Sequence, residues 1–346
     1  MNKPINDSFF KYVRGFLTVY LPRNKCYSAN TVKAYRDTIN LLRIFLSEQK
    51  KIPFTRITFS MINHTLVYEF LEWLQSSRNC IVSTRNQRLA ALKSFLHYCA
   101  NSEPAIAAVY MDVQDITALR DTKKGVSYMS RNALKAVLKQ PDTRNRLDLR
   151  NRFFMIIMYD TGGRIQEILD LKLRDICLDL DIPLIYLTGK GNKVRAVPLM
   201  DKTILHFKEY LKVFHPLYPE KIDDYLFYTV IKDRKGPMSP DNVSVFIKKY
   251  AEQARVFCPE VPEKVHAHLF RHSRAMHLYQ SGIPLSYIKD FLGHVSADTT
   301  SIYASADTTM IRDALEKAAK MENSSYAETP VWEDNEDMIL KLCGLK

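Results

Sequence analysis

The stretch HLFRHSRAMHLYQSGIPLSYIKDFLGH, residues 268 to 294, sets the organisation of the second half of the chain. His268 and Arg271 are three positions apart, which places both side chains on one face of a predicted helix. Gly293 is typical of a helix end and puts His294 in the turn that follows. Tyr303 comes nine positions after His294, and we expect it on the next short helix.

Upstream of this stretch, the pattern predicts helices at about 130–140, 146–159 and 164–171, and TGGRIQEIL (161–169) predicts a turn that leads into the last of them. DICLDLDIPLIYLTGKGNKVRAVPL (175–199) alternates between apolar and polar residues and contains a glycine-rich turn. It predicts a short antiparallel sheet with Lys190 on a hairpin. From residue 202 onward the pattern is helical again.

The polar residues of these motifs suit phosphodiester chemistry. A phosphodiester attacked in line gains negative charge on its non-bridging oxygens, and arginine supplies flat, permanently charged donor pairs for them. Arg164 and Arg271 are the candidates. A histidine can donate to the same oxygens or move a proton, and a lysine can protonate the leaving oxygen. A free tyrosine titrates near ~10, so Tyr303 needs a base or a cationic pocket to attack.

Simpler interpretations exist for each motif taken alone. TGGR is also a common turn before a helix, GKGNK is also a basic surface turn, and Tyr303 is one of 19 tyrosines. The histidines at 266, 268, 272 and 277 could suggest a metal, but neither a cysteine pair nor an HExxH spacing accompanies them. We therefore expect no metal and no cofactor.

Composition favours a nucleic-acid partner. The chain has 346 residues, of which 46% are hydrophobic, and a formal net charge of +12. This length predicts two domains with ample core, and the charge predicts a polyanionic partner, although a solvated basic surface gives the same balance. No apolar run approaches the about 18 residues of a membrane span, and the amino terminus lacks a signal pattern, so we expect a cytoplasmic protein. The six cysteines lack regular spacing and are expected to be reduced.

The first 110 residues carry 15 basic and 6 acidic residues and predict a four-helix domain. One helix follows Ser28, a plausible cap, with an apolar stripe at 32, 35, 39, 42, 45 and 46; a second follows Ser83. Further helices are expected around 6–21 and 63–75. Charged residues on other faces of the first two helices are the candidate DNA contacts: Lys33, Arg36, Arg43, Arg85 and Arg88. A merely solvated face is the alternative.

Domain boundaries follow from where the periodicity lapses. We expect a helical DNA-binding domain at 1–110, a linker at 111–126, a catalytic domain at 127–320 and an acidic tail at 321–346. The tail ends in NEDMILKLCGL, a short amphipathic segment whose simpler interpretation is a frayed end or a helix docked on its own chain.

The ordered motifs TGGRIQEIL, GKGNKVRAVPL, HLFRH, LGH and SIYASAD resemble the tyrosine recombinase family of phage integrases and Xer-type and Cre-type enzymes. The six catalytic positions of that family match, in chain order, Arg164, Lys190, His268, Arg271, His294 and Tyr303. The first half resembles the family's core-binding domain in its helical pattern and in SANTVKAYRDTI (28–39). Gly163 and Phe270 depart from the usual family residues without touching the chemistry.

The resemblance implies a mainly α fold with a small antiparallel β-sheet, formed by a four-helix, SAM-like core-binding domain and a mixed α/β catalytic domain. It implies that Tyr303 cuts DNA as a 3′-phosphotyrosine, that Lys190 protonates the 5′ oxygen and that His268 acts as base toward the tyrosine. Arg164, Arg271 and His294 would hold the phosphate. A second strand's 5′ hydroxyl would reverse the step without ATP or metal.

The expected partner is double-stranded DNA with inverted-repeat core sites, bound by four protomers that are monomers when free; accessory proteins are left open. The expected role is integration, excision or transposition of a mobile element. Resolution of chromosome or plasmid dimers by the same chemistry is the alternative. A type IB topoisomerase, which relaxes a single duplex, and a non-catalytic DNA-binding regulator are the rivals from other classes. The terminal helix is expected to pack into a neighbouring protomer.

Overall fold

The computed structural model describes residues 9–121, 125–189, 191–294, 300, 302–303 and 335–345. The chain divides into two compact units, Met1–Lys123 and Lys124–Lys346. The described elements are mostly helices, with one three-stranded and one two-stranded antiparallel sheet. The predicted fold class is confirmed.

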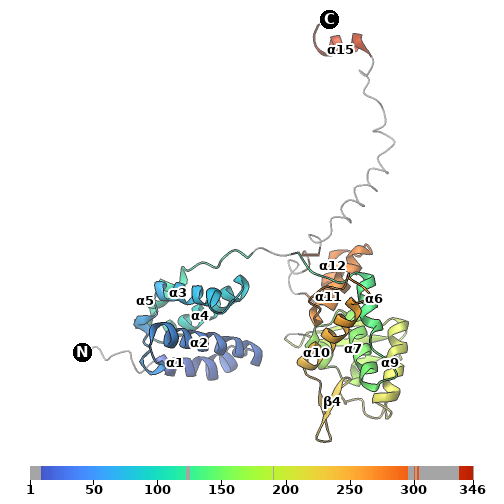
Figure 1. Cartoon of the computed structure of the whole chain (residues 1–346), viewed down its shortest axis with the longest axis horizontal. Helices are drawn as coiled ribbons and strands as arrows, with labels where there is room; N and C mark the ends of the chain where they lie inside the picture. The colour runs from blue at the N-terminus through green and yellow to red at the C-terminus, as the bar shows by residue number, and fades with distance from the viewer. Residues whose placement is uncertain are drawn as a thin grey trace, which may run out of the picture. The chain divides into compact units, whose positions relative to one another are not determined.

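The first unit is a bundle of helices packed on a common core (Figure 1). Its longer elements are α1 (Phe9–Gly15), a π-helix (Phe16–Asn24), α2 (Ala29–Lys50), α3 (His64–Ser76), α4 (Val82–Ser102) and α5 (Ala107–Gln114). The four predicted helices are present, and the first of them continues as a π-helix past its expected end. α5 is a fifth helix that the sequence pattern does not predict.

The start of α2 follows from its cap. The Ser28 hydroxyl accepts a hydrogen bond from the Thr31 backbone N–H at 3.3 Å, as an N-cap residue should. The predicted apolar stripe faces the core, since five of its six members are buried and Tyr35 is half-buried. The prediction of a capped, amphipathic helix after Ser28 is therefore confirmed.

The first unit extends beyond the expected boundary at residue 110. Val113 on α5 and Ile116 just after it are fully buried in the core of this unit. The Lys93 ammonium on α4 donates to the carbonyl oxygens of Gln114 and Ile116, at 2.7 and 2.6 Å, and so holds the end of α5. Val113 and Ile116 are too few to form a periodic apolar pattern, and Lys93 lies far away in the sequence. For this reason the sequence suggests a linker here.

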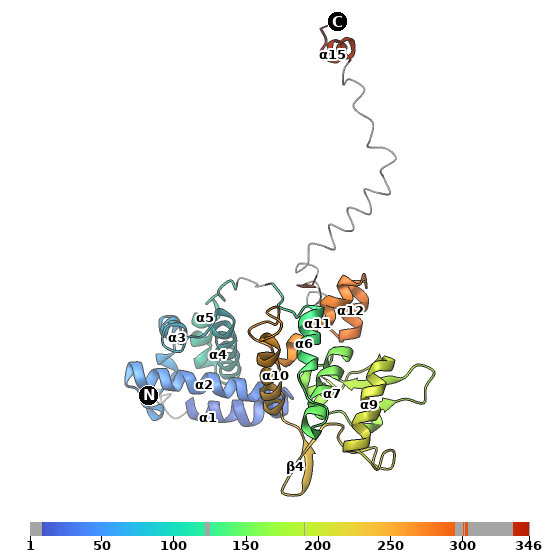
Figure 2. The same cartoon turned by 45° about the vertical axis from the view of Figure 1, so that its right-hand side comes forward.

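The second unit is built around α7 (Arg146–Thr161), in which residues 153–158 are all buried. α7 lies between α9 (Asp201–Phe214) and α10 (Pro240–Arg255) in both views (Figures 1 and 2). The other helices near the core are α6 (Arg131–Lys139), α8 (Ile165–Leu169), α11 (Ala267–Gln280) and α12 (Leu285–Leu292). A helical stretch buried on all sides, as residues 153–158 are, needs no amphipathic stripe, and it positions the turn that follows the helix.

The predicted sheet is present and has the strand order β1 (Ile176–Cys177), β2 (Leu184–Thr188) and β3 (Val194–Pro198). β2 and β3 pair from Leu184↔Pro198 to Thr188↔Val194. The Gly189 N–H donates to the Lys193 carbonyl at 2.8 Å, and Gly191 and Asn192 both have positive φ, as a tight hairpin connection requires. Lys190 itself lies outside the described residues.

A second hairpin interrupts the region expected to be helical. β4 (Tyr228–Ile231) pairs with β5 (Arg234–Pro237), and the hairpin projects from the body of the unit in both views (Figures 1 and 2). Its two-residue turn is formed by Lys232 and Asp233, with φ of 49° and 60°. Hairpins of this type usually carry Asn-Gly or Asp-Gly, so Lys-Asp gives no recognisable turn signal.

The predictions for residues 268–294 are confirmed. His268 and Arg271 lie on α11, and Gly293 ends α12 in the left-handed region at φ 64°. The terminal segment contains α15 (Glu336–Leu342), and Asn335 is its N-cap residue. The Met338 N–H donates to the Asn335 side-chain oxygen at 3.1 Å. Its apolar side chains at 338, 339 and 342 are exposed, as is Leu345 just beyond it.

Candidate active site

The turn between α7 and α8 presents Arg164. Gly162 ends α7 in the left-handed region at φ 57°, and the Gly163 N–H donates to the Thr161 hydroxyl at 3.2 Å. A side chain at Gly162 would collide with Leu292 of α12, because a Cβ atom there would lie 2.8 Å from Leu292 Cδ2. The glycine therefore permits both the turn and the close approach of α12, and Arg164 follows as the cap residue of α8.

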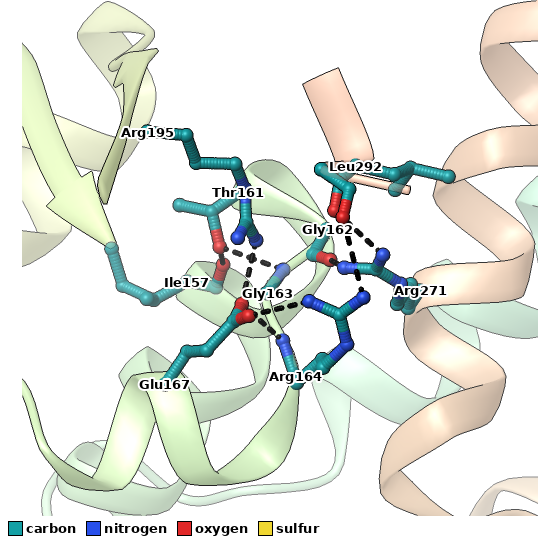
Figure 3. A network of polar contacts seen from close by, with 10 residues as sticks. Ile157, Thr161, Gly162, Gly163, Arg164, Glu167, Arg195, Arg271 and Leu292 are labelled. Carbon is teal, nitrogen blue, oxygen red and sulfur yellow. Dashed lines mark hydrogen bonds and ion pairs between the residues drawn. The ribbon is translucent and has the colours of Figure 1, made fainter. Parts of the chain in front are cut away.

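Glu167 fixes the Arg164 guanidinium from the first turn of α8. Its carboxylate accepts from the Arg164 backbone N–H at 2.9 Å, from Arg164 Nη1 at 2.7 Å and from Arg195 Nη2 at 2.6 Å (Figure 3). The Glu167 side chain is only 4% exposed. Burial alone raises the pKa of this carboxyl, but hydrogen bonds from Arg195 and Arg164 outweigh it and hold the pKa below its ordinary value. Glu167 is thus an ionised anchor.

Arg271 joins the ends of two helices. It is 1% exposed, and its guanidinium donates to the Gly162 carbonyl at 2.6 Å and to the Leu292 carbonyl at 2.7 Å (Figure 3). Desolvation, followed by the positive charges of Arg164 and Arg195, lowers the pKa of Arg271 to about 10. The group still carries its charge at neutral pH, and a pKa shifted by neighbouring cations indicates a site that favours an anion.

The charge balance around these residues points the same way. Three guanidinium groups, those of Arg164, Arg195 and Arg271, interact with the Glu167 carboxylate. In the described part of the site two positive charges are left in excess. The Arg164 side chain is 39% exposed, so a ligand can reach it from solvent. An oxyanion with several acceptor oxygens, such as a phosphodiester, fits this arrangement.

Two histidines border this cationic centre. The His268 ring is partly covered by His272, although the residue keeps part of its surface exposed. Desolvation and then the charge of Arg271 lower the pKa of His268. His294 Nδ1 is 2.9 Å from the Thr300 hydroxyl oxygen, and desolvation, then Arg271 and Arg164, lower the pKa of His294 to about 4. Both rings are therefore neutral at pH 7, and each keeps one N–H that can donate to a phosphate oxygen.

Tyr303 is buried next to the same centre, with 1% of its surface exposed. Its hydroxyl is 3.0 Å from His272 Nδ1. Burial raises the pKa of Tyr303, and the positive charge of Arg271 opposes that rise. The structure therefore places the hydroxyl against His272, whereas the family resemblance assigns the role of base to His268.

The structure brings together five of the six predicted catalytic residues: Arg164, His268, Arg271, His294 and Tyr303. The sixth, Lys190, falls outside the described residues. Three further residues of the site were not assigned a role from the sequence, namely Glu167, Arg195 and His272. For two of them the sequence contains a feature that could have indicated the role. Glu167 has the N3 spacing of a capping box, and His272 lies one helical turn after His268.

Comparisons with known proteins agree with this geometry. The phage integrase family matches residues 127–310, and the N-terminal SAM-like domain of phage integrases matches residues 15–102. The chain belongs to the phage integrase family of tyrosine recombinases. It is accordingly an enzyme of the tyrosine recombinase type.

The recombinase is similar to several named relatives. The putative integrase/recombinase y4rC of Sinorhizobium fredii is 29% identical over 328 residues, which are 94% of each chain. The tyrosine recombinase XerC of Halalkalibacterium halodurans is 27% identical over 311 residues, 88% of this chain and 95% of the relative. The crystal structure of the XerH site-specific recombinase bound to its difH substrate has a TM-score of 0.61 at 26% identity, covering 82% of this chain and 78% of that chain.

The basic residues predicted to contact DNA lie on α2 and α4 of the SAM-like unit. Lys33, Arg36 and Arg43 are exposed on α2. Arg88 is half-buried, and its Nη1 donates to the Ala34 carbonyl at 2.9 Å and the Thr38 hydroxyl at 3.1 Å, both on α2. Arg85 is only 4% exposed. The expectation that Arg85 lies on an open helix face is wrong, because α4 packs this face against the rest of the bundle.

Other predictions about the recombinase concern metals, thiols and membranes. Across the described ranges, no group of three His, Cys, Asp or Glu residues is arranged to hold a metal ion; metal-free chemistry stays a prediction. All six cysteines are free thiols. Among the helices that the structure describes, none is long and apolar enough to cross a membrane.

Proposed function

We propose that the chain is a site-specific DNA recombinase that breaks and rejoins strands through a 3′-phosphotyrosine at Tyr303, in the integration, excision or transposition of a mobile element. The observation that carries the proposal is the cationic centre of Arg164 and Arg271 beside the buried Tyr303. The similarity to a putative integrase/recombinase over 94% of both chains supports the mobile-element role.

In the proposed step the scissile phosphate enters the centre, where Arg164 and Arg271 neutralise its non-bridging oxygens and His268 and His294 donate to them. The Tyr303 oxygen forms a bond to phosphorus as the bond to the 5′ oxygen breaks. The departing oxygen takes a proton from Lys190. Because Arg271 is held by two backbone carbonyls, little reorganisation is needed when negative charge develops.

Rejoining needs no added energy. The phosphotyrosine is itself a phosphodiester, so the 5′ hydroxyl of another strand can attack it and release Tyr303. We propose that four protomers on two inverted-repeat sites carry out two such rounds through a four-way junction. Cleavage then requires neither nucleotide nor metal ion.

We propose the first unit as the DNA-binding arm and α15 as a contact to a neighbouring protomer. The exposed basic residues of α2 support the first role, because phosphate contacts come from such side chains. The exposed apolar side chains of α15 support the second, since a short helix with uncovered apolar residues gains by burying them. The acidic residues 336 and 337 at its start suit a protein surface better than a DNA groove.

Resolution of chromosome or plasmid dimers is the second candidate role. The similarity to a XerC recombinase over 95% of the relative's length favours it. The two roles share one chemistry and differ in the DNA site. Sequencing the DNA around the gene distinguishes them, because flanking inverted repeats or element ends indicate a mobile element.

The chemistry is tested with a suicide substrate that is nicked near the cleavage point. The wild-type protein should form a denaturation-resistant covalent adduct in excess EDTA and without nucleotide. Tyr303→Phe should bind the same DNA and form no adduct, because only the attacking oxygen is removed. An adduct with Tyr303→Phe would place the nucleophile elsewhere, and strict dependence on Mg²⁺ would contradict the metal-free step.

The role of Lys190 is separated from phosphate binding with a 5′-bridging phosphorothiolate, whose thiolate needs no proton to depart. Lys190→Ala should cleave the normal substrate poorly and recover on the phosphorothiolate. Arg164→Ala serves as the matched control and should not recover. Equal behaviour of the two variants would reassign Lys190 to phosphate binding.

A further inference from the structure

The hydroxyl of Tyr303 has its hydrogen-bond partner on α11. His272 Nδ1 lies 3.0 Å from it, and the two ring centroids are 5.8 Å apart. His272 follows Arg271 directly and lies one helical turn after His268. We propose that His272 is the base that accepts the Tyr303 proton during cleavage, an assignment that rests on the proposed role of Tyr303 as nucleophile.

The protonation state of the pair suits this role. Desolvation, followed by the charges of His268, His266 and Arg271, lowers the pKa of His272 to about 4. At pH 7 the ring is therefore neutral. The tyrosine keeps its proton, since burial raises its pKa. In the tautomer that carries its proton on Nε2, the hydroxyl donates to Nδ1, and the lone pair of Nδ1 accepts the proton that must leave.

Binding of DNA makes this proton transfer more favourable. The groups whose charge bears on His272 are His266, His268 and Arg271, and Arg271 in turn feels Arg164 and Arg195. A phosphate in the centre adds negative charge close to Arg271 and Arg164 and so raises the pKa of His272. The base is thus weak in the free protein and strengthens when the substrate is in place.

The step balances in protons and electrons. The Tyr303 O–H bond breaks and its proton passes to His272 Nδ1. The oxygen electron pair forms the bond to phosphorus, and the electrons of the bond to the 5′ oxygen stay on that oxygen, which takes a proton from Lys190. In rejoining, the imidazolium of His272 returns its proton to the departing tyrosine oxygen.

His268 is positioned for another task. Its ring packs edge-on against His272 with centroids 4.5 Å apart and is exposed at the rim. Among the described residues no hydrogen bond joins His268 to Tyr303. We assign His268 the role of donating to the phosphate oxygens. The family resemblance alone would make His268 the base.

The same helix supplies a matched control. His277 Nδ1 on α11 lies 2.8 Å from the Tyr159 hydroxyl, and desolvation and the charge of Arg131 lower the pKa of His277 to about 4. This pair has the same chemistry as the His272–Tyr303 pair, and one member of each is buried: His277 is 2% exposed here, and Tyr303 is 1% exposed there. The control pair does not include the proposed nucleophile. Changes at His277 therefore reproduce the structural cost of losing such a pair.

The experiment compares His272→Asn with His277→Asn. Asparagine keeps an acceptor near the position of Nδ1 and cannot take a proton at neutral pH. Single-turnover formation of the covalent adduct should fall about 100-fold or more in His272→Asn, within the range of general-base effects, and stay within a few-fold of wild type in His277→Asn. Half-site binding and thermal unfolding of both variants show whether the fold is kept.

A second measurement excludes a purely structural effect. Site-specific incorporation of a ring-fluorinated tyrosine at position 303 supplies a more acidic phenol that needs less help from a base. The loss in His272→Asn should shrink to within tenfold, whereas a loss in His268→Ala should remain. The base assignment is overturned if His272→Asn cleaves like wild type, or if the fluorinated residue leaves its loss unchanged.

The two hypotheses fail in different ways. If Tyr303→Phe still forms the adduct, Tyr303 is not the nucleophile, and the proposed function is contradicted. If Tyr303→Phe is inactive and His272→Asn is fully active, only the assignment of His272 as the base is contradicted.

Discussion

At the scale of single residues, the site depends on a buried carboxylate shared by two arginines. Glu167 accepts from Arg164 on its own helix and from Arg195 on β3. The Arg195 side chain is 13% exposed and lies close to Gly293, because a Cβ atom added at Gly293 would be 3.3 Å from Arg195 Cδ. Gly293 is in the turn that carries His294. Arg195 is a positioning residue that links β3, α8 and the end of α12.

This arrangement predicts that Arg195 acts through Arg164. Arg195→Ala should lower the single-turnover cleavage rate about tenfold to 100-fold, because Glu167 then loses its bond to β3 and holds Arg164 less rigidly. In an Arg164→Ala background the same change should cost little more. Arg174→Ala is the control, since Arg174 pairs with Asp223 on the surface of the same unit. Losses that multiply in the double variant would mean that Arg195 acts independently.

At the scale of elements, α2 is the part of the first unit best suited to meet DNA. Its exposed Lys33, Arg36 and Arg43 contrast with Arg85 on α4, which is buried. If each α2 side chain binds one phosphate, Lys33→Ala, Arg36→Ala and Arg43→Ala should each reduce the slope of log K against log salt concentration by about 0.9. Arg85→Ala should lower thermal stability and leave the slope unchanged. If the three α2 variants keep the wild-type slope, that face is only solvated.

The elements also show how far the sequence could be interpreted. The helix after Ser28, the β2–β3 hairpin and the helix end at Gly293 were predictable because caps, alternation and glycine act locally. The β4–β5 hairpin was not, since the Lys232–Asp233 turn adopts positive φ without the usual residues. Neither was the pairing of Arg195 with Glu167, because residues 28 positions apart meet only through the fold. The position of His272 against Tyr303 has the same origin.

At the scale of the whole molecule, assembly should depend on the C-terminal segment. Deleting residues 329–346 should leave binding to one half-site intact and reduce cooperative occupation of paired sites, because the exposed apolar residues of α15 are removed. Gel-shift titrations on single and paired sites and the yield of recombinant DNA measure the effect. Normal synaptic complexes and normal recombination by the shortened chain would remove this role.

Stability of the catalytic unit should depend on pH. His272, His277 and His294 each have a folded-state pKa of about 4, against 6.5 for an ordinary histidine. Between these values the unfolded chain binds more protons, so the free energy of unfolding rises with pH and is fully present above about 6.5. Each histidine changes the free energy of unfolding by at most about 1.4 kcal/mol per pH unit.

Urea unfolding at pH 7 and pH 5 tests this dependence. The wild-type protein should be clearly less stable at pH 5, and His277→Gln should show a smaller difference between the two pH values because one titrating group is absent. A difference that is the same in both proteins would mean that His277 does not contribute.

The burial of Tyr303 has a consequence for the safety of the host genome. Every link between two nucleotides of DNA is a phosphodiester, and a protein that carried an exposed tyrosinate among three arginines could nick whichever one it met. Here the phenol is 1% exposed and keeps its proton while the protein is free. If Tyr303 is the nucleophile, as proposed, chance collisions with DNA should therefore be harmless. Reactivity should be confined to complexes that last long enough to bring a phosphate and the tyrosine together.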